Sequence, residues 1–255
     1  MSIRFDDDPD FSEIIPKPSP RRRYTLVKVG LVVAVIVFLI SLFLPASRTA
    51  RPAARRMQCS SNLRQIVLAL NNYEQVYKTL PPAYTVDPDG SPMHSWRTLI
   101  LPYMDEQALY ESIDFSKPWN DPANAPALAK RPSLFRCPNL YDSPNQTAYL
   151  AIVGPGNFLD PGRPRRLEEI TDGLSTVLAV IEVGQEAAVP WMAPTDANLA
   201  LVLKLDPKAN HLHSGGMNAA FVDGSVRFLR ADLPAPIWRA LLSISGNDDP
   251  AAMDW

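Results

Sequence analysis

The sequence predicts an α+β protein in which an N-terminal transmembrane helix extends into a long helix packed on a mainly antiparallel β-sheet. Three observations carry this prediction. An uncharged apolar run occupies Val29 to Ala46, apolar residues then recur at helical spacing, and an Asp-Gly pair separates two β-prone segments. The 26 prolines against 11 glycines further favour a loop-rich head, because proline fixes φ and interrupts helices and central strands.

The first segment, residues 1–23, is expected to be a disordered cytoplasmic tail. It is rich in acidic residues and proline and shows little periodicity, a composition too polar to build a core. Over the whole chain the net charge is -2 and 20% of the residues are charged. Such a balance offers no broad positive surface for phosphate neutralisation, so we expect no nucleic-acid partner.

The segment 24–46 is interpreted as the transmembrane anchor. Its apolar run is long enough to cross about 30 Å of hydrocarbon if the preceding residues lie at the interface. A buried core helix is one alternative, but an amphipathic helix would show a polar stripe and this segment offers only Ser41. A cleaved signal peptide is another, but the apolar run exceeds the usual length and no clean small-x-small cleavage site follows it. We therefore expect a single-pass membrane protein.

Residues 47–80 are predicted to form a linking, amphipathic helix. Apolar side chains recur there at three- and four-residue intervals and define one face: Leu63, Ile66, Val67, Leu70, Tyr73 and Tyr77. Pro81 and Pro82 are expected to end this helix. Because Pro52 has no amide hydrogen to donate, we also expect a kink or a restart between the membrane and Met57.

Residues 81–232 are predicted to form the head, and residues 233–255 a C-terminal tail. Short β-prone segments bounded by turn signals stand at 147–154, 175–184, 217–222 and 225–230. The last two flank Asp223-Gly224. Asp-Gly in this setting favours a hairpin with a two-residue type I′ turn, in which both central residues take positive φ.

Several blocks of sequence are shared, in the same order, with one known family. His213 is followed after nine residues by Asp223-Gly224. Upstream stand RRMQCSSNLRQIVLAL, HSWRTLILPYMDEQALY, FRCP, ITDGLSTVLAVIEVG and VPWMAPTD. Over roughly residues 24 to 230 the chain therefore resembles the pseudopilin-like family of unknown function, domain of unknown function 1559, whose members end in an H-X9-DG motif. The resemblance implies a pilin-like helix packed on the sheet.

Members of that family usually begin with a prepilin-type signal, a glycine followed by Phe-Thr-Leu-x-Glu at the start of the apolar helix. The corresponding stretch here reads Arg23-Tyr24-Thr25-Leu26-Val27-Lys28. Arg23 replaces the glycine that the processing peptidase needs. Lys28 replaces the glutamate that is thought to meet the freed amino terminus of a neighbouring subunit. Because the two losses agree with each other, we expect an uncleaved, permanently anchored protein rather than a polymerising subunit.

Basic residues lie close to both ends of the apolar run, so the charge rule alone leaves its orientation open. The resemblance implies a bacterial inner-membrane protein with a cytoplasmic N-terminus and a head in the periplasm or another extracytoplasmic space. Cys59 and Cys137 both follow the apolar run, and disulfides persist in such a compartment. We therefore expect a Cys59–Cys137 disulfide.

Residues of the H-X9-DG motif, His213, Asp223 and Gly224, are the first candidates for chemistry. A Ser-His-Asp enzyme would use Ser214, but there is no G-x-S-x-G elbow and this serine is adjacent to His213 in sequence. His211, His213 and Asp223 are candidate ligands for a divalent metal. Two histidines two residues apart are a weak metal signal, so a structural role beside the hairpin is favoured. We expect no cofactor, no metal and no enzymatic activity.

Other polar and aromatic residues of the family blocks are further candidates for ligand sites. Trp96, Trp119 and Trp191 are candidates for an aromatic ligand surface, with a packed core as the favoured alternative. His94 is expected to be a structural hydrogen-bonding residue. Glu182 and Asp196 have no partner that the sequence identifies.

The function expected from these observations is a non-enzymatic, membrane-anchored protein with a binding, scaffolding or export-associated role. One alternative is a metal-dependent ligand-binding protein or enzyme that uses His211, His213 and Asp223. The other is a minor pseudopilin of a type II secretion system, against which Arg23 and Lys28 argue. Expected partners are the membrane and the protein components of a pilin-like or secretion assembly.

Overall fold

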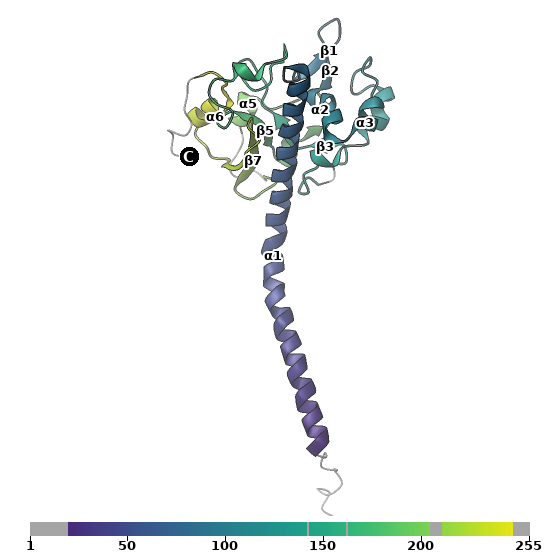
Figure 1. The fold of residues 1–255 in the computed structure, drawn as a ribbon, viewed down its shortest axis with the longest axis vertical. Helices are drawn as coiled ribbons and strands as arrows, with labels where there is room; N and C mark the ends of the chain where they lie inside the picture. Colours follow the sequence, from purple (N-terminus) through teal and green to yellow (C-terminus); the bar gives the residue numbers. More distant parts are fainter. Residues whose placement is uncertain (1–19, 142, 162, 205–210, 247–255) are drawn as a thin grey trace, which may run out of the picture. The chain divides into compact units, whose positions relative to one another are not determined.

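The computed structural model describes residues 20–246 except 142, 162 and 205–210, and leaves aside the side chains at 20–23, 26 and 42–50 (Figure 1). Most of the predicted cytoplasmic tail therefore lies outside the described residues. The chain divides into two compact units, Met1–Arg51 and Pro52–Trp255. The longest helix, α1, spans Pro20–Tyr77 and contributes to both.

In the first unit, α1 carries apolar side chains on all sides. The large side chains exposed between residues 29 and 40 are Val29, Leu31, Val32, Val33, Val35, Ile36, Val37, Phe38, Leu39 and Ile40. Among the described residues, no helix has the length and apolar character needed to span a membrane. The side chains at 42–46, part of the predicted anchor, lie outside that set.

The helix assignment runs through Pro52 without a break, so α1 does not restart before Met57, and a kink in this stretch stays a prediction. Within the second unit, α1 ends at Tyr77, and Lys78 takes a left-handed conformation with φ of 59°. The helix thus stops a few residues before Pro81.

The predicted apolar face of α1 is confirmed over most of its length. One side of the helix in the second unit is buried, with Cys59, Asn62, Leu63, Ile66, Val67 and Leu70. Tyr73 is partly buried against the core, whereas Tyr77 is 58% exposed. The buried face therefore ends about one turn earlier than its spacing predicted.

A four-stranded antiparallel sheet forms the centre of the head, in the order β4-β5-β7-β8. Its strands are β4 (Tyr149–Ala151), β5 (Leu178–Glu182), β7 (Gly216–Phe221) and β8 (Val226–Arg230). Two smaller antiparallel pairs join β1 (Tyr84–Val86) to β2 (Pro92–Ser95) and β3 (Gln146–Thr147) to β6 (Val189–Pro190). The predicted α+β class with antiparallel pairing is confirmed.

Short helical turns and loops make up the rest of the head. The α-helices are α2 (Trp96–Leu99), α3 (Gln107–Glu111), α4 (Ala125–Leu128), α5 (Leu199–Val202) and α6 (Ala235–Leu242). The 3-10 turns are η2 (Leu101–Met104), η3 (Pro122–Asn124), η4 (Ser133–Phe135), η5 (Leu167–Glu169) and η6 (Gln185–Ala187). These short elements agree with the loop-rich head that the proline content favours.

The head extends beyond residue 232, the predicted end of this domain. Helix α6 buries Ile237, Trp238 and Leu241, and the backbone amide of Thr171 donates to the carbonyl of Ile244 at 2.8 Å. This part of the expected C-terminal tail is therefore an amphipathic element of the core. Only residues 247–255 of that tail lie outside the described part of the chain.

The predicted hairpin joins β7 to β8, with Ala220 opposite Val226. Its turn differs from the predicted type I′. The amide of Gly224 donates to the carbonyl of Phe221 at 3.0 Å, and positive φ occurs at Gly224 (83°) but not at Asp223. This is the pattern of a longer hairpin loop with glycine in the left-handed position. Asp223 instead accepts a hydrogen bond from the amide of Ser225 at 2.8 Å.

Candidate functional site

Four polar side chains from separate segments converge inside the head. Their potential ligand atoms all lie within 4.8 Å of one another, and the residues are Cys59, Cys137, Glu182 and His213. Cys59 lies on α1, Cys137 follows η4, Glu182 ends β5 and His213 precedes β7. All four residues are buried. We call this group the four-residue cluster.

The two sulfur atoms of the cluster are in contact but not bonded. Cys59 and Cys137 are free, and their Sγ atoms lie 2.9 Å apart. A disulfide requires about 2.05 Å. The predicted disulfide is therefore not seen in this structure. Cys59 of α1 and Cys137 of the FRCP segment are nevertheless neighbours, as the expected disulfide requires.

Glu182 and His213 form a buried pair beside the thiols. His213 Nε2 lies 3.2 Å from Glu182 Oε2, and their side chains are 4% and 1% exposed. The same oxygen accepts a hydrogen bond from Asn218 Nδ2 at 2.7 Å. The other oxygen, Oε1, is buried and forms no hydrogen bond with a described residue, and His213 Nε2 lacks one of ordinary geometry. The cluster thus holds polar atoms with unused bonding capacity.

His213 and Glu182 each shift the pKa of the other toward its charged form. Burial alone would lower the pKa of His213, but its contacts with Cys137 and Glu182 raise that pKa to about 9. Burial favours the neutral form of Glu182, but His213 and the two thiols lower the pKa of its carboxyl below the ordinary value. Contact with Cys59 and burial raise the pKa of the Cys137 thiol. The shifts of these pKa values thus favour the charged forms of His213 and Glu182 and the neutral form of the Cys137 thiol.

Sheet pairing explains how distant residues meet in the cluster. Every residue of β5 is buried, so its final residue, Glu182, is carried into the interior. The register pairs Ile181 with Ala219, which places Glu182 beside Asn218. His213 lies at the entry to β7, and Gly215 has φ of 88°, a conformation that glycine adopts at little cost. The chain can therefore turn into β7 directly after His213.

The H-X9-DG residues do not form a single site. His213 and Asp223 lie beyond opposite ends of β7, His213 being buried and Asp223 exposed at the hairpin loop. The metal candidates of the sequence analysis are therefore not brought together, and only His213 belongs to the four-residue cluster. Neither His211 nor Asp223 is a member. The predicted role of His213 beside the base of the hairpin agrees with its bridge to Gly216.

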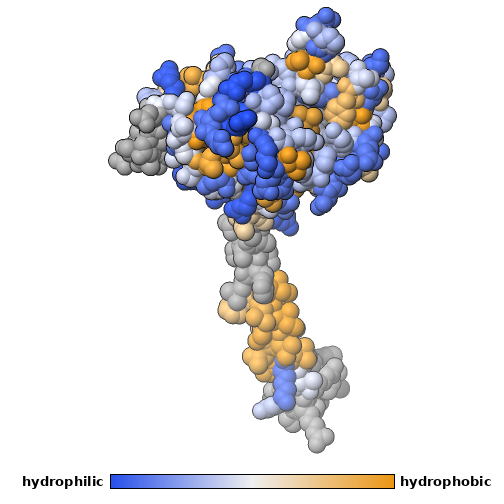
Figure 2. All heavy atoms as spheres, turned by 45° about the horizontal axis from the view of Figure 1, so that its top comes forward, coloured by the Kyte–Doolittle hydropathy of each residue, from blue (hydrophilic) through white to orange (hydrophobic). Residues whose placement is uncertain are grey.

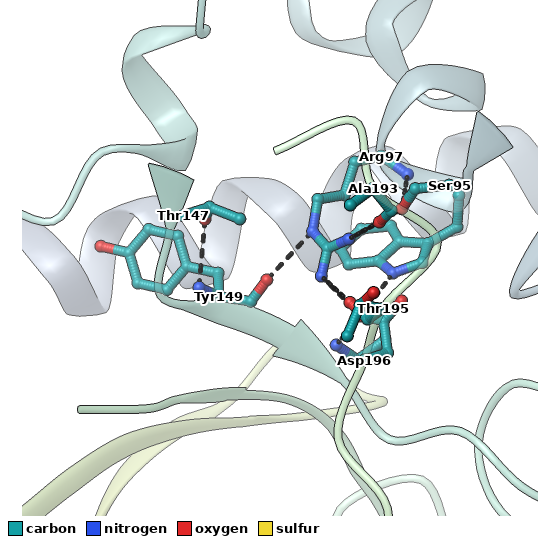
Figure 3. Close-up of polar contacts among 9 residues, drawn as sticks. Ser95, Arg97, Thr147, Tyr149, Ala193, Thr195 and Asp196 are labelled. Carbon is teal, nitrogen blue, oxygen red and sulfur yellow. Dashed lines mark hydrogen bonds and ion pairs between the residues drawn. The ribbon is translucent and has the colours of Figure 1, made fainter. Parts of the chain in front are cut away.

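A second buried group centres on Arg97 at the start of α2 (Figure 3). Arg97 Nη2 lies 2.6 Å from Asp196 Oδ1, and their side chains are 0% and 4% exposed. The guanidinium also donates to the Tyr149 carbonyl at 3.1 Å and to Ser95 Oγ at 2.8 Å. This group joins α2, β4 and the loop that contains Asp196.

Asp196 is the acceptor that organises this second group. Its Oδ1 also accepts hydrogen bonds from Trp96 Nε1 at 3.0 Å and from the amide of Ala151 at 2.9 Å. Burial raises the pKa of Asp196 to about 6, against the opposing effect of Arg97. Burial also lowers the pKa of Arg97. Arg97 and Asp196 thus form a buried structural ion pair that links α2, β4 and the loop that contains Asp196.

The tryptophans considered as a ligand surface are mostly core residues. Trp96 and Trp191 are 0% exposed, and Trp191 Nε1 donates to the carbonyl of Leu128 at 2.9 Å. Trp119 is partly buried against the core. The candidate aromatic surface is therefore wrong for Trp96 and Trp191, because their rings fill the interior. His94 has the structural role predicted for it, since its Nε2 lies 2.7 Å from the carbonyl of Lys117.

In a comparison with protein-family models, residues 48–156 match the family described as "Protein of unknown function (DUF1559)". Residues 48–156 of the chain are thus similar to the DUF1559 family. Neither the curated proteins nor the solved structures give a match. The DUF1559 segment contains Cys59, Arg97 and Cys137, whereas Lys28 precedes it and His213 follows it. The prepilin-like stretch and the H-X9-DG motif therefore lie outside the DUF1559 match.

Proposed function

We propose that this protein is a membrane-anchored, extracytoplasmic head with a non-enzymatic binding or scaffolding role. The observation that carries the proposal is the apolar surface of α1 in the first unit, which is orange in Figure 2. The large side chains from Val29 to Ile40 are about half to two-thirds exposed. Exposed apolar area is unfavourable in water by about 25 cal/mol per Å². A continuous surface of this kind marks contact with lipid or with another apolar surface.

The distribution of these side chains favours lipid over a partner protein. An interface with one partner helix needs an apolar stripe on one side only. Here the consecutive residues Leu31, Val32 and Val33 all present exposed apolar side chains, so the helix is apolar around its circumference. The uncharged run continues in the sequence to Ala46, and basic residues flank it on both sides. This pattern supports a single span.

The polar groups of the head support a non-enzymatic role. The Arg97–Asp196 pair and the four-residue cluster are both buried, so a substrate has no direct access to either. A catalytic group needs to lie within hydrogen-bond reach of its substrate. These buried groups serve instead to hold segments of the head in place.

A pocket on the head surface is the place where a partner would bind. It is lined by residues in and around β1 and by residues of the loop before η5: Pro82, Tyr84, Thr85, Val86, Gly90, Pro161, Arg163 and Pro164. Proline and tyrosine give such a pocket an apolar, rigid lining. Arg163, one of the lining residues, forms an ion pair with Glu169 at 2.7 Å. These features suit a polypeptide segment better than a small polar metabolite.

Lys28 supports an anchored protein over a minor pseudopilin. Its ammonium lies 5.5 Å from the centre of the Tyr24 ring, a cation–π distance. A glutamate at this position would meet the amino terminus of a neighbouring subunit in an assembling pilin, whereas lysine would repel it. The charge at this position therefore favours a protein that stays uncleaved in the membrane.

Reporter fusions test the proposal. Alkaline phosphatase joined after Trp255 is expected to be active and green fluorescent protein at the same point to be dark, with both fusions in the membrane fraction. Replacing Val33 and Val37 with aspartate should release the protein from that fraction or prevent its export. The matched control replaces Leu68 and Val76, which are exposed on the same helix within the head, and should leave fractionation unchanged. A fluorescent fusion in the soluble fraction would contradict the proposal.

A further inference from the structure

We propose that Cys59, Cys137, Glu182 and His213 bind one zinc ion and that this ion clamps α1 to the head. The proposal begins with the convergence of four donors from four segments, whose ligand atoms lie within 4.8 Å of one another. Tetrahedral zinc with Zn–S bonds of about 2.3 Å places two sulfur ligands roughly 3.8 Å apart. Only a small opening of the 2.9 Å sulfur–sulfur contact is required.

The donor types identify the class of metal. Two thiolates with an imidazole select zinc and similar thiophilic ions, whereas calcium and magnesium prefer oxygen ligands. A divalent cation would also offset the negative charge that two thiolates and the Glu182 carboxylate bring into a buried space. Because all four residues are buried and supply four ligands, no open position is left for substrate. Sites closed in this way are structural rather than catalytic.

Unused polar atoms favour the metal over a disulfide. Oε1 of Glu182 is buried without a hydrogen bond to a described residue, and His213 Nε2 lacks one of ordinary geometry. A Cys59–Cys137 disulfide would remove the two S–H donors and leave both of these atoms without a new partner. Buried polar groups without partners are costly. A metal ion satisfies the carboxylate oxygen, the imidazole nitrogen and both sulfurs at once.

Neighbouring residues already hold the ligands in position. Asn218 donates to Glu182 Oε2 at 2.7 Å, which leaves Oε1 available to a metal. The amide group of Asn139 lies 3.4 Å from His213 Nδ1, on the side of the ring away from Nε2. Such outer contacts orient metal ligands, and their loss typically weakens metal binding by about 10–100-fold. The cluster therefore has the support that a metal site needs.

Metal binding by the full-length protein, purified in detergent with reductant, tests the proposal. Zinc analysis after dialysis should give one ion per chain. Titration with Co²⁺ should give sulfur-to-cobalt charge transfer and the visible bands of tetrahedral cobalt. X-ray absorption of the zinc-loaded wild type should show two sulfur ligands at about 2.3 Å. This last measurement needs no variant, so it does not depend on how a substitution affects folding.

Variants assign the ligands. Cys59→Ser and Cys137→Ser should each lose the charge-transfer band. Asn218→Ala should weaken zinc binding by about 10–100-fold. Glu182→Gln and His213→Gln, which remove a ligand itself, should weaken zinc binding by more than that. His211→Gln, just outside the cluster, is the matched control and should bind zinc like the wild type. The proposal is overturned if the reduced wild type takes up no stoichiometric metal, or if sulfur is absent from its coordination shell. It is equally overturned if the cysteine variants bind zinc unchanged.

Discussion

Arg97 Nη2 lies 2.6 Å from Asp196 Oδ1 in the core of the head, and this contact ties α2 to a loop that follows it by almost a hundred residues. Replacing Arg97 with methionine keeps much of the side-chain volume but leaves Asp196 buried without its counter-charge. Breaking a buried pair in this way typically costs about 3–5 kcal/mol. We expect a loss of this size in the free energy of unfolding at pH 7.5, measured by urea denaturation.

The same pair predicts a pH dependence. The pKa of Asp196 in the folded protein is raised to about 6 from an ordinary value of 3.8. Between these values the folded state binds more protons than the unfolded state, so this group's contribution to stability falls as the pH rises from about 4 to about 6. Arg97 opposes this rise in the pKa of Asp196, because it stabilises the carboxylate. Arg97→Met should therefore lower the free energy of unfolding by more at pH 7.5 than at pH 4.

Arg64→Met, on the exposed side of α1, is the control for both measurements. It should change stability by no more than about 0.5 kcal/mol at either pH. An Arg97→Met loss that is equally large at pH 4 and pH 7.5 would show that Asp196 does not titrate as described.

Gly216 allows β7 and β8 to approach closely. A Cβ atom added at Gly216 would lie 2.1 Å from the backbone oxygen of Leu229 and 3.1 Å from the Phe228 ring. Gly216→Ala should therefore destabilise the head by at least the roughly 1–3 kcal/mol typical of overpacking. Gly224→Asn is the matched comparison, because the space around Gly224 is open and asparagine tolerates its positive φ. Equal thermal shifts for the two variants would contradict this account.

Local sequence patterns predicted the secondary structure of the head well. The spacing of Leu63, Ile66 and Leu70 identified the buried face of α1, and Asp223-Gly224 identified the hairpin. The turn type was wrong because Asp-Gly suits more than one hairpin loop, and the loop length is set by the register of the strands. Helix α6 was missed although Ile237 and Leu241 are spaced four residues apart, as on one helical face.

The buried polar groups were harder to predict, because they depend on contacts between distant segments. The two cysteines suggested their own proximity, since two such residues in one compartment often pair. Glu182 and Asp196 gave no such signal, because their partners are set by strand register and by loop packing. One clue was available for Glu182. A carboxylate that ends the otherwise apolar stretch LAVIE is carried inward with its strand and needs a buried partner.

Zinc should contribute directly to stability. If the ion binds only the folded head, a free concentration of about 1,000 times the dissociation constant stabilises it by about 4 kcal/mol. A strong chelator should therefore lower the melting temperature of the reduced wild type. Cys59→Ser should have this lower melting temperature without chelator, and adding the chelator should not change it. A wild-type melting temperature that is insensitive to both zinc and chelator would contradict the clamp.

The amino-terminal sequence predicts that no prepilin peptidase cleaves before Tyr24. Intact-mass measurement of the membrane protein should recover the residues upstream of Tyr24 and show no methylation at that position. A double variant, Arg23→Gly with Lys28→Glu, restores the family pattern and should become cleavable when a prepilin peptidase is co-expressed. Lys28→Glu alone, which keeps Arg23, is the control and should stay uncleaved. A wild-type protein that begins at Tyr24 would refute the permanent anchor.

The four-residue cluster is the feature that most directly links the fold of this protein to a chemical property. The decisive measurement is a crystal structure of the reduced, zinc-loaded full-length protein, with anomalous diffraction recorded on both sides of the zinc edge. We predict a single anomalous peak about 2.3 Å from the sulfurs of Cys59 and Cys137 and about 2.0–2.2 Å from His213 Nε2 and a Glu182 oxygen. The contrary result is an empty position between these side chains, with continuous density joining the two sulfurs at about 2.05 Å.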